Sequence, residues 1–396
     1  MDRSIVHIDL DTFFVSVERL LDARLNNRPV LVGGTGGRGV VAACSYESRT
    51  YGIYSGMPMR MAQRLCPEAV IIRGDGGTYS KYSQMVTHII KEEAPLYEKS
   101  SVDEFYIDAS GMDRFFGTWK WARELREKII RETGLPVSFA LSTNKTVAKV
   151  GTGEAKPNNC INIPKGYEKG FLAPLPVKKI PMVGDKSYKM LLNMGIKYVK
   201  TLQQMPVELL ESIMGKNGIA LWKKAQGIDN TPVEPYSERK SVSSSITFDK
   251  DTTDIRQLKN ILTAMAEKLA YQLRKKQKLT SVVTVTIRYS DFDTRTRQQR
   301  IPYTSLDHTL KETVCDLFER LYERRVLVRL VGVRYSGLIS GNYQMNLFED
   351  TAEMIGLYQA MDNIRNRFGS SAIKTVSTMG TRLRNGGSPF HGNLKP

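Results

Sequence analysis

The sequence predicts an α+β fold divided into several domains, and three observations support this prediction. The chain has 396 residues, which is more than one ordinary domain holds, so two to four domains are expected. Apolar residues make up 41% of the chain, enough to build separate cores. Strand-like and helix-like segments alternate without the regular spacing of repeated βαβ units, which favours sheets layered by helices over a doubly wound fold.

The charge balance indicates a polyanionic partner. Lys and Arg number 58 against 41 Asp and Glu, a formal net charge of +17. Nucleic acid is the commonest such partner, and an acidic membrane surface is the alternative. No long apolar segment and no signal-like start occur, and the four cysteines form no CxxC pair. We therefore expect a cytoplasmic protein with reduced thiols and no membrane association.

The first half of the chain reads as alternating strands and helices. Helical spacing of apolar residues stops before Pro67 and Pro95, since proline cannot continue a helix. Strands are predicted at Ser4–Asp9, Pro29–Val32, Gly39–Ala43, Glu98–Ile107 (a strand pair) and Val137–Ser142. Helices are predicted at Phe13–Asp22, Met57–Cys66, Thr78–Glu93 and Thr118–Thr133.

Gly34-Thr-Gly-Gly-Arg-Gly39 matches the GxGxxG pattern of dinucleotide-binding proteins. That fingerprint needs a helix after it, whereas the strand-like run Val40-Val41-Ala42 follows here. We therefore interpret the segment as the loop of a β-hairpin.

From Pro164 to Asn230 the chain changes to short helices broken by proline and glycine. Ile180-Pro-Met-Val-Gly-Asp-Lys186, followed by a helical run ending at Met194-Gly195, suggests a helix-hairpin-helix. Such a hairpin points backbone N–H groups at a phosphate without reading bases. A plain αα-hairpin is the alternative.

Thr231–Lys240 carries prolines and charges and is interpreted as an interdomain linker. A second α+β unit follows, in which residues 233–345 hold 20 Lys and Arg against 13 Asp and Glu. Its predicted strands are Ser241–Phe248, Leu279–Tyr289 and Leu327–Ile339, and its predicted helices are Ile255–Gln277 and Leu306–Arg325.

Three arginines in this unit lie at nearly alternate positions of an extended segment, so they are expected to share one face: Arg295, Arg297 and Arg300. We favour a surface that follows phosphates over an ordinary solvated basic face.

Carboxylates in two short contexts carry the chemistry. The first is His7-Ile-Asp9-Leu-Asp11, an apolar run that ends in acid, and the second is Val102-Asp103-Glu104-Phe105 in a strand-like stretch. Hard cations such as Mg²⁺ take carboxylate oxygens together with substrate phosphates. Acids held on a sheet are what two-metal phosphoryl transfer needs, although each context alone is equally typical of a strand end.

Two basic residues are candidates for binding phosphate near these acids. Arg49 follows a strand in Ser45-Tyr46-Glu47-Ser48-Arg49, and its planar guanidinium suits a triphosphate. Lys156 offers a point charge before Pro157. Each alone is more typical of a solvated side chain.

Five segments in this order and spacing resemble the Y-family translesion DNA polymerases, in particular the bacterial DinB type. They are HIDLDTFFVSVE, SYESRTYGIYSGMPMRMA, SSVDEFYID, ALSTNKTVAKVGTGEAKPN and the IPMVG hairpin. The resemblance runs from about residue 3 to residue 340 and implies a right-hand polymerase with a family-specific α+β little finger. The implied boundaries are palm 1–10 and 77–165, fingers 11–76, thumb 166–232, linker 233–240, little finger 241–340 and a C-terminal segment 341–396.

The resemblance implies a role for each matching residue. Asp9 and Asp103 correspond to the metal-binding carboxylates, Glu104 to the catalytic acid beside them, and Leu10 to a backbone carbonyl ligand. Phe14 falls on the steric gate that excludes a ribose 2′-hydroxyl. The nucleotide-binding positions are Phe13, Phe14, Tyr46, Arg49 and Lys156. For Asp11 and Asp108 we expect only helix or turn capping.

The sequence departs from the family pattern at three positions. Ala43 stands where many relatives have threonine, and Thr12 where a cysteine or tyrosine is frequent. Met182 replaces the first glycine of the hairpin, and a side chain at this position hinders the close approach of the backbone to phosphate.

The implied reaction is template-directed addition of deoxynucleoside triphosphates to a primer 3′-hydroxyl with two Mg²⁺ ions. One ion lowers the pKa of the primer hydroxyl, and the other holds the triphosphate. No histidine base is required, so His7 is expected to be structural. Chain length leaves no room for a proofreading exonuclease, which predicts error-prone synthesis by a monomer bound to primer-template DNA.

Beyond the little finger, Gln344-Met-Asn-Leu347-Phe348 resembles the peptide by which bacterial polymerases bind the sliding clamp. A glutamine followed by two apolar side chains suits a preformed apolar pocket, with Gln344, Leu347 and Phe348 as the anchors. Asp350–Phe368 then reads as an amphipathic helix and Arg382–Pro396 as a loose tail.

Two other functions remain open from the sequence. A nucleotidyl cyclase carries a similar acidic hairpin, but it gives no reason for the basic second unit or the clamp peptide. A non-catalytic DNA-binding relative is the other, and it would have lost a metal carboxylate, whereas all three acids are present.

Overall fold

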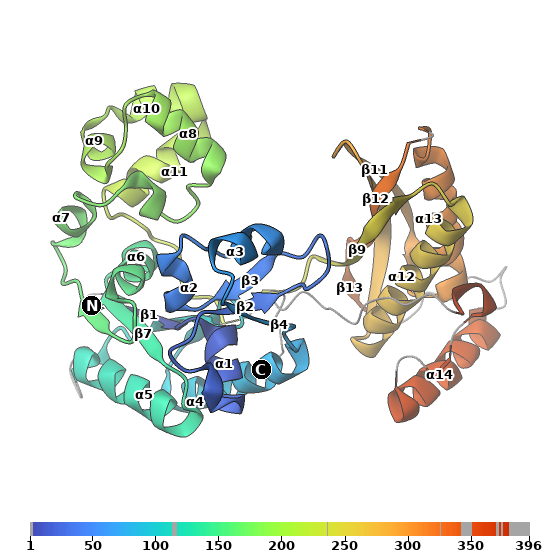
Figure 1. The fold of residues 1–396 in the computed structure, drawn as a ribbon, viewed down its shortest axis with the longest axis horizontal. Coiled ribbons are helices and arrows are strands. Elements are labelled where there is room, and N and C mark those ends of the chain that lie inside the picture. Colours follow the sequence, from blue (N-terminus) through green and yellow to red (C-terminus); the bar gives the residue numbers. More distant parts are fainter. Residues whose placement is uncertain are drawn as a thin grey trace. The chain divides into compact units, whose positions relative to one another are not determined.

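A computed structural model describes residues 3–112, 117–235, 237–324, 326–341, 351–369, 372–373 and 375–379. The chain forms two compact units that meet in sequence between Ser237 and Glu238 (Figure 1). In the part of the chain so described, no helix is long and apolar enough to cross a membrane. Each unit has its own hydrophobic core.

The first unit is built on a five-stranded sheet with the order β5-β6-β1-β7-β8. Its strands are β1 (Ile5–Leu10), β5 (Tyr97–Lys99), β6 (Glu104–Asp108), β7 (Val137–Ser142) and β8 (Cys160–Asn162). Strand β1 lies at the centre and pairs antiparallel with both β6 and β7. Because side chains alternate along a strand, Val6, Ile8 and Leu10 enter the core while His7 and Asp9 face the other side.

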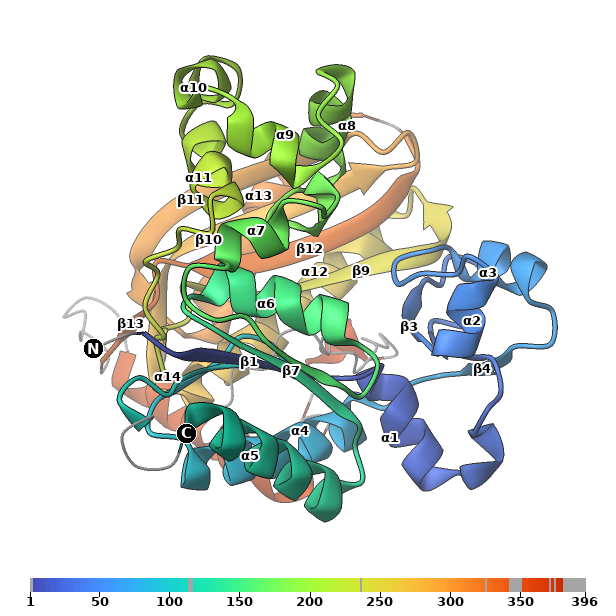
Figure 2. The ribbon, with the colours of Figure 1, turned by 90° about the vertical axis from the view of Figure 1, so that its left-hand side faces the viewer.

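Helices cover both faces of this sheet. On the face of Val6 and Ile8 the core is completed by α4 (Gly76–Glu93) and α5 (Thr118–Thr133). The opposite face, which carries Asp9, is crossed by α6 (Lys145–Ala155), as Figure 2 shows. Helix α6 begins at Asn144, whose side chain accepts a hydrogen bond from the N–H of Val147.

A three-stranded sheet with the order β3-β2-β4 forms a separate layer with its own small core. Strands β2 (Val30–Gly33) and β3 (Val41–Cys44) are antiparallel, so the glycine-rich segment between them is a hairpin loop, as predicted. Strand β4 (Val70–Ile72) was not predicted, since its three residues carry no periodic pattern. The accompanying helices are α1 (Phe13–Leu21), α2 (Tyr46–Thr50) and α3 (Met59–Leu65).

Short helices follow, as predicted: α7 (Glu168–Leu172), α8 (Asp185–Asn193), α9 (Val199–Gln204), α10 (Val207–Met214) and α11 (Lys216–Ala225). They enclose a core that includes Leu191, Val199 and Leu210. The hairpin before α8 contains Met182 with φ 77°, and this side chain is 85% exposed. The backbone at this position is therefore in the region that glycine adopts with least strain.

The second unit is a four-stranded sheet, order β11-β10-β12-β9, with two helices on one face. Its strands are β9 (Ser241–Thr252), β10 (Lys278–Tyr289), β11 (Thr294–Thr304) and β12 (Val328–Ser336), with β13 (Ile339–Ser340) beside β10. The helices are α12 (Ile255–Lys275) and α13 (Asp307–Leu321). A later helix, α14 (Thr351–Phe368), agrees with the amphipathic helix predicted there.

The prediction that Arg295, Arg297 and Arg300 share a face is wrong. Arg295 and Arg297 lie opposite Ile287 and Val285, on the helix-covered side, where Arg297 donates to the carbonyl of Arg320 at 2.6 Å. Arg300 lies opposite Val282, on the other face. The reason is the two-residue period of a strand: three positions separate Arg297 from Arg300, an odd number that reverses the direction of the side chain.

Candidate active site

The three predicted acids meet at one end of the central sheet. Asp9 of β1 pairs directly with Glu104 of β6, so their side chains leave the same face of adjacent strands. Asp103 precedes Glu104, and its carbonyl accepts a hydrogen bond from the N–H of Leu10 at 3.0 Å. Ser101, which sequence reasoning missed, donates its hydroxyl to the Asp103 carboxylate. The sheet register therefore brings together acids that lie almost a hundred residues apart in sequence.

Lysines from α6 and its C-terminal end contact these acids. Lys156 forms an ion pair with Asp9 and lies 3.9 Å from a carboxylate oxygen of Asp11. Lys149 Nζ is 2.5 Å from Glu104 Oε2, a contact that the sequence did not predict. Lys156 was predicted to bind triphosphate, and in this structure it lies at the carboxylates.

Burial and mutual repulsion disfavour ionised acids here. Burial is the largest cause that raises the pKa of Asp9 to about 7, with the carboxylates of Glu104 and Asp103 adding to it against the opposing effect of Lys156. Burial likewise raises the pKa of Asp103. An additional cation at this site would relieve the same repulsion.

Within the described residues, no three acidic, histidine or cysteine side chains are gathered closely enough to hold a metal ion by themselves. The donor set nevertheless fits Mg²⁺, because hard oxygen ligands converge here and Mg²⁺ takes its remaining ligands from water and substrate phosphates. The raised pKa of Asp9 agrees with a site that has an excess of negative charge.

Two phenylalanines begin the helix that follows β1. Phe13 and Phe14 are 3% and 5% exposed at the start of α1, immediately beyond Asp9 and Leu10. The Phe14 ring stacks on Tyr79 of α4 with ring centroids 4.4 Å apart. The Tyr79 hydroxyl donates to Glu18 Oε1 at 2.5 Å. Tyr79 was missed because nothing in its local sequence distinguishes it from an ordinary core tyrosine.

Tyr46 and Arg49 lie one helical turn apart on α2, and the Arg49 guanidinium carbon is 4.8 Å from the Tyr46 ring centroid. Burial is the largest cause that raises the pKa of the Tyr46 hydroxyl, and the Asp11 carboxylate beside it adds to this effect. Tyr46 therefore lies close to the acidic site.

The expectation that Asp11 caps a helix is wrong. Its side chain is buried, Oδ2 accepts hydrogen bonds from Ser138 Oγ at 2.8 Å and from the N–H of Asn158, and Oδ1 lies 3.9 Å from Lys156 Nζ. Thr12 is the N-cap of α1 instead, with φ 42°. The capping rule considers only neighbours in sequence. The position of the Asp11 carboxylate is set instead by contacts with residues far along the chain, such as Ser138 and Lys156. Asp108 does cap a turn, because it accepts from the N–H of Ser110.

His7 is structural, as predicted. Its ring is buried, and Nδ1 lies 2.9 Å from the Thr152 hydroxyl. Burial is the largest cause that lowers its pKa well below the usual value. Because its pKa is lowered and Nδ1 is held by Thr152, this ring is a poor proton acceptor at neutral pH.

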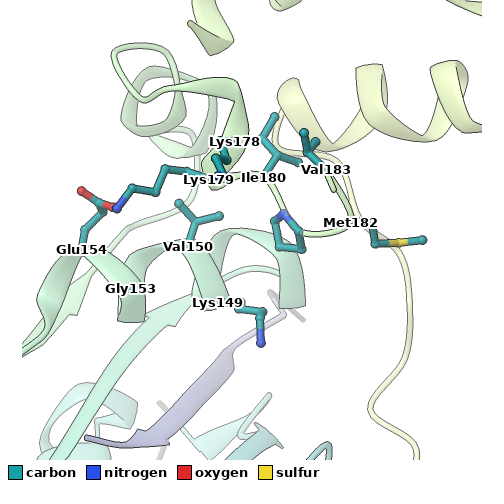
Figure 3. A pocket seen from close by; sticks show the side chains of 10 residues that line it. Lys149, Val150, Gly153, Glu154, Lys178, Lys179, Ile180, Met182 and Val183 are labelled. Carbon is teal, nitrogen blue, oxygen red and sulfur yellow. The ribbon is translucent and has the colours of Figure 1, made fainter. Parts of the chain in front are cut away.

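A cavity of about 270 Å³ separates α6 from the hairpin before α8 (Figure 3). Its lining includes Lys149, Lys179 and Met182. Lys179 forms an ion pair with Glu154 at 2.8 Å. Lys149 thus reaches both the cavity and Glu104, so the hairpin lies close to the acidic site. The predicted clamp anchors Gln344, Leu347 and Phe348 lie outside the described residues.

Comparison with known proteins agrees with this geometry. The impB/mucB/samB family matches residues 8–153, and the C-terminal domain of that family matches residues 239–347. DNA polymerase IV of Dehalococcoides mccartyi strain BAV1 is 37% identical over 380 residues, covering 95% of this chain and 97% of the relative. DNA polymerase IV of Clostridium perfringens strain ATCC 13124 is 36% identical, covering 85% and 95%.

A solved Y-family DNA polymerase chimera, Dbh-Dpo4(243-245)-Dbh, has the same fold with a TM-score of 0.76 at 25% identity. The match covers 85% of this chain and 100% of the chimera. The chain therefore belongs to the Y-family of translesion DNA polymerases, with palm, fingers, thumb and little finger. Within that family its relatives are of the DNA polymerase IV type, and it is a DNA-directed DNA polymerase.

Proposed function

We propose that Asp9, Asp103 and Glu104 carry out template-directed nucleotidyl transfer by a two-metal mechanism. The observation that carries this proposal is the register of β1 and β6, which places Asp9 beside Glu104 with Asp103 adjacent. Rigid strands hold the acids, which gives the positional precision that phosphoryl transfer requires.

Two Mg²⁺ ions would be held by these acids and by the Leu10 carbonyl. When bound, they would supply charge neutralisation on the triphosphate and a lower pKa for the primer hydroxyl. The chain itself orients the groups: Lys149 holds one oxygen of Glu104, and Ser101 holds Asp103. The second Glu104 oxygen would remain available to bind a metal ion.

The incoming deoxynucleoside triphosphate would contact Tyr46, Arg49 and Lys156 through its phosphates. The Tyr46 hydroxyl and the forked guanidinium of Arg49 supply donors on one helix turn. Lys156 would leave its ion pair with Asp9 and bind phosphate oxygens instead. Phe13 and Phe14 would contact the nucleotide, with Phe14, backed by Tyr79, as the ring beneath the sugar that excludes a 2′-hydroxyl.

Primer-template DNA would be held by backbone contacts rather than base contacts. In the second unit the sheet face opposite the helices carries hydroxyl side chains with exposed Arg300 and Arg334, as the register of β10 with β11 and β12 shows. Hydroxyls and arginines at alternate strand positions are suited to phosphate oxygens. The hairpin at Met182 offers a second contact.

We assign the palm to 1–10 and 77–165, fingers to 11–76, thumb to 166–232, linker to 233–240, little finger to 241–340 and the clamp-binding segment to 341–396. One family match lies in each of the two folded units. We also propose low-fidelity synthesis by a cytoplasmic monomer. Clamp binding through Gln344, Leu347 and Phe348 rests on their sequence.

Primer extension with and without Mg²⁺ tests the proposal. We expect deoxynucleotides to be added opposite a template base only when Mg²⁺ and the template strand are both present. Formation of a cyclic nucleotide from a triphosphate without DNA would instead identify a cyclase, and DNA binding without any extension would identify a non-catalytic relative.

A further inference from the structure

Helix α14 packs on the second unit through charged and polar side chains. The Arg274 guanidinium on α12 binds both oxygens of Asp362, with Nε–Oδ2 2.6 Å and Nη2–Oδ1 3.0 Å. Tyr271 donates its hydroxyl to Asn366 Oδ1 at 2.7 Å. Two-point contact between a planar guanidinium and a carboxylate fixes the orientation of the helix.

Two further residues of α14 are buried in the same contact. Tyr358 is 6% exposed, its hydroxyl accepts from the N–H of His308 at 3.1 Å, and the Arg274 guanidinium lies over its ring. Arg365 is 5% exposed and lies 3.9 Å from the Asp307 carboxylate. The inward face of α14 thus combines ionic side chains with apolar ones, since Met354, Ile355 and Met361 are also partly buried.

The flank of α14 beside this contact is apolar and exposed. Leu357, Ile364 and Phe368 are 51%, 42% and 67% exposed. Their spacing of seven and four residues places them in one stripe along the helix. A rigid stripe of large apolar side chains facing water is the pattern of a protein–protein contact. The family match ends at residue 347, so the stripe belongs to a part of the chain beyond the family domains.

We propose that this stripe binds the sliding clamp beside the pocket that receives Gln344, Leu347 and Phe348. This inference rests on the clamp binding proposed above. Phe348 and Thr351, where α14 begins, are three positions apart. Three residues span at most about 11 Å, so a clamp that holds Phe348 must lie next to α14. The partner surface would be apolar, with an acidic group near Arg367.

A second copy of this chain is the weaker occupant. Three exposed side chains bury far less than the roughly 1,200 Å² of a stable, specific interface. A contact with the clamp needs no such area. The peptide with Leu347 and Phe348 would already hold the clamp, and the stripe would add to an existing contact. The ionic contact with Arg274 and Asp307 holds the stripe in one orientation before the clamp arrives.

Surface-immobilised sliding clamp and the full-length polymerase provide the test. The stripe variant Leu357→Ser with Ile364→Ser is compared with a control on other exposed α14 positions, Gln359→Ser with Asn363→Ser, and with Leu347→Ala plus Phe348→Ala. We expect the dissociation constant of the stripe variant to rise about tenfold or more, since two partly buried apolar contacts are lost. The control should match wild type, and the peptide variant should lose binding.

Melting temperature and extension of bare primer-template should stay unchanged in the stripe variant. If the double substitution lowers the melting temperature, Leu357→Gln, at the more exposed of the two positions, replaces it. Clamp affinity equal to wild type in the stripe variant would overturn the inference, and a change in self-association instead would assign the stripe to a second copy. A peptide variant that still binds would refute the underlying clamp proposal separately.

Discussion

At the residue scale, the proposed discrimination between sugars rests on the stacked pair Phe14 and Tyr79. Both rings are buried beside the end of β1, and their centroids are 4.4 Å apart. Stacking on Tyr79 restricts the movement of the Phe14 ring. The gate we propose therefore acts by shape, in which a clash, rather than an attraction, sets the preference.

Replacing this ring tests the gate. Phe14→Ala should lower the preference for a deoxynucleotide over its ribonucleotide by about tenfold or more, because the clash is removed while other contacts persist. The measurement is kcat/KM for both nucleotides opposite the same template base. Tyr79→Phe, which keeps the stacked ring and loses only the bond to Glu18, serves as the control. Unchanged discrimination in Phe14→Ala would move the gate to Phe13.

The acidic site should exchange a proton for a metal ion. Because burial raises the pKa of Asp9 to about 7, the metal-free site holds a proton below that pH, and a cation must displace it. Mn²⁺, used as a probe, should therefore bind more weakly as pH falls from 8 to 6, by about tenfold per unit below the pKa. Electron paramagnetic resonance measures the free ion. A pH-independent affinity in wild type, or the same slope in Asp9→Asn, would contradict this assignment.

The residues that the sequence could predict are those with a local signature. Asp103 and Glu104 are adjacent in an apolar run, and Asp9 ends another. Tyr79, Lys149 and the buried state of Asp11 were not predictable in this way, because each depends on a partner far along the chain. The family resemblance identified the positions of the site residues. The contacts between these residues could not be predicted, because they depend on the register of the sheet.

At the element scale, the hairpin before α8 is a strained turn. Met182 has φ 77°, a backbone conformation that a side chain disfavours, and its own side chain is largely in solvent. The family resemblance implied glycine at this position, and the backbone of Met182 has the conformation that glycine adopts with least strain.

Met182→Gly should stabilise the protein by about 0.5–1 kcal/mol, since the strain of a left-handed residue exceeds the added freedom of glycine in the unfolded chain. Chemical denaturation of wild type and variant gives the difference in the free energy of unfolding. Met182→Ala, which keeps a Cβ, is the matched control and should leave stability nearly unchanged. A destabilised glycine variant would show that the turn is not strained at this position.

The two sheets also show how far periodicity reaches. Runs of apolar residues predicted β1, β7 and β10 closely, and all three strands are largely buried. The arginines of β11 are only nearly alternate: two positions separate Arg295 from Arg297, but three separate Arg297 from Arg300, which places Arg300 on the other face. Their partners on α13, such as the carbonyl of Arg320, are invisible in a local pattern.

At the scale of the whole molecule, each folded unit contains one family match. Helix α14 follows the match in the second unit. The unit with the acids contains all residues proposed for chemistry. The segment proposed for the clamp lies between β13 and α14, in the other unit. Chemistry and clamp binding should therefore be separable by substitution.

A processivity experiment tests this separation. Leu347→Ala with Phe348→Ala should abolish stimulation by a loaded clamp, because truncating interface anchors costs about 2 kcal/mol or more each. Extension of bare primer-template should equal that of wild type. Product length with and without clamp is the measurement. A variant stimulated as strongly as wild type would show that this segment is not the docking site.

The central claim is that Asp9, Asp103 and Glu104 form the catalytic site, and single-turnover primer extension tests it most directly. Asp9→Ala, Asp103→Ala and Glu104→Ala are each measured with Mg²⁺ at saturating DNA and nucleotide, alongside binding of fluorescent primer-template. Loss of transition-state charge stabilisation should cost several kcal/mol, so each rate should fall by about 100-fold or more while DNA affinity stays near wild type. Any one variant that keeps more than about a tenth of the wild-type rate would contradict the assignment of that acid to the catalytic site.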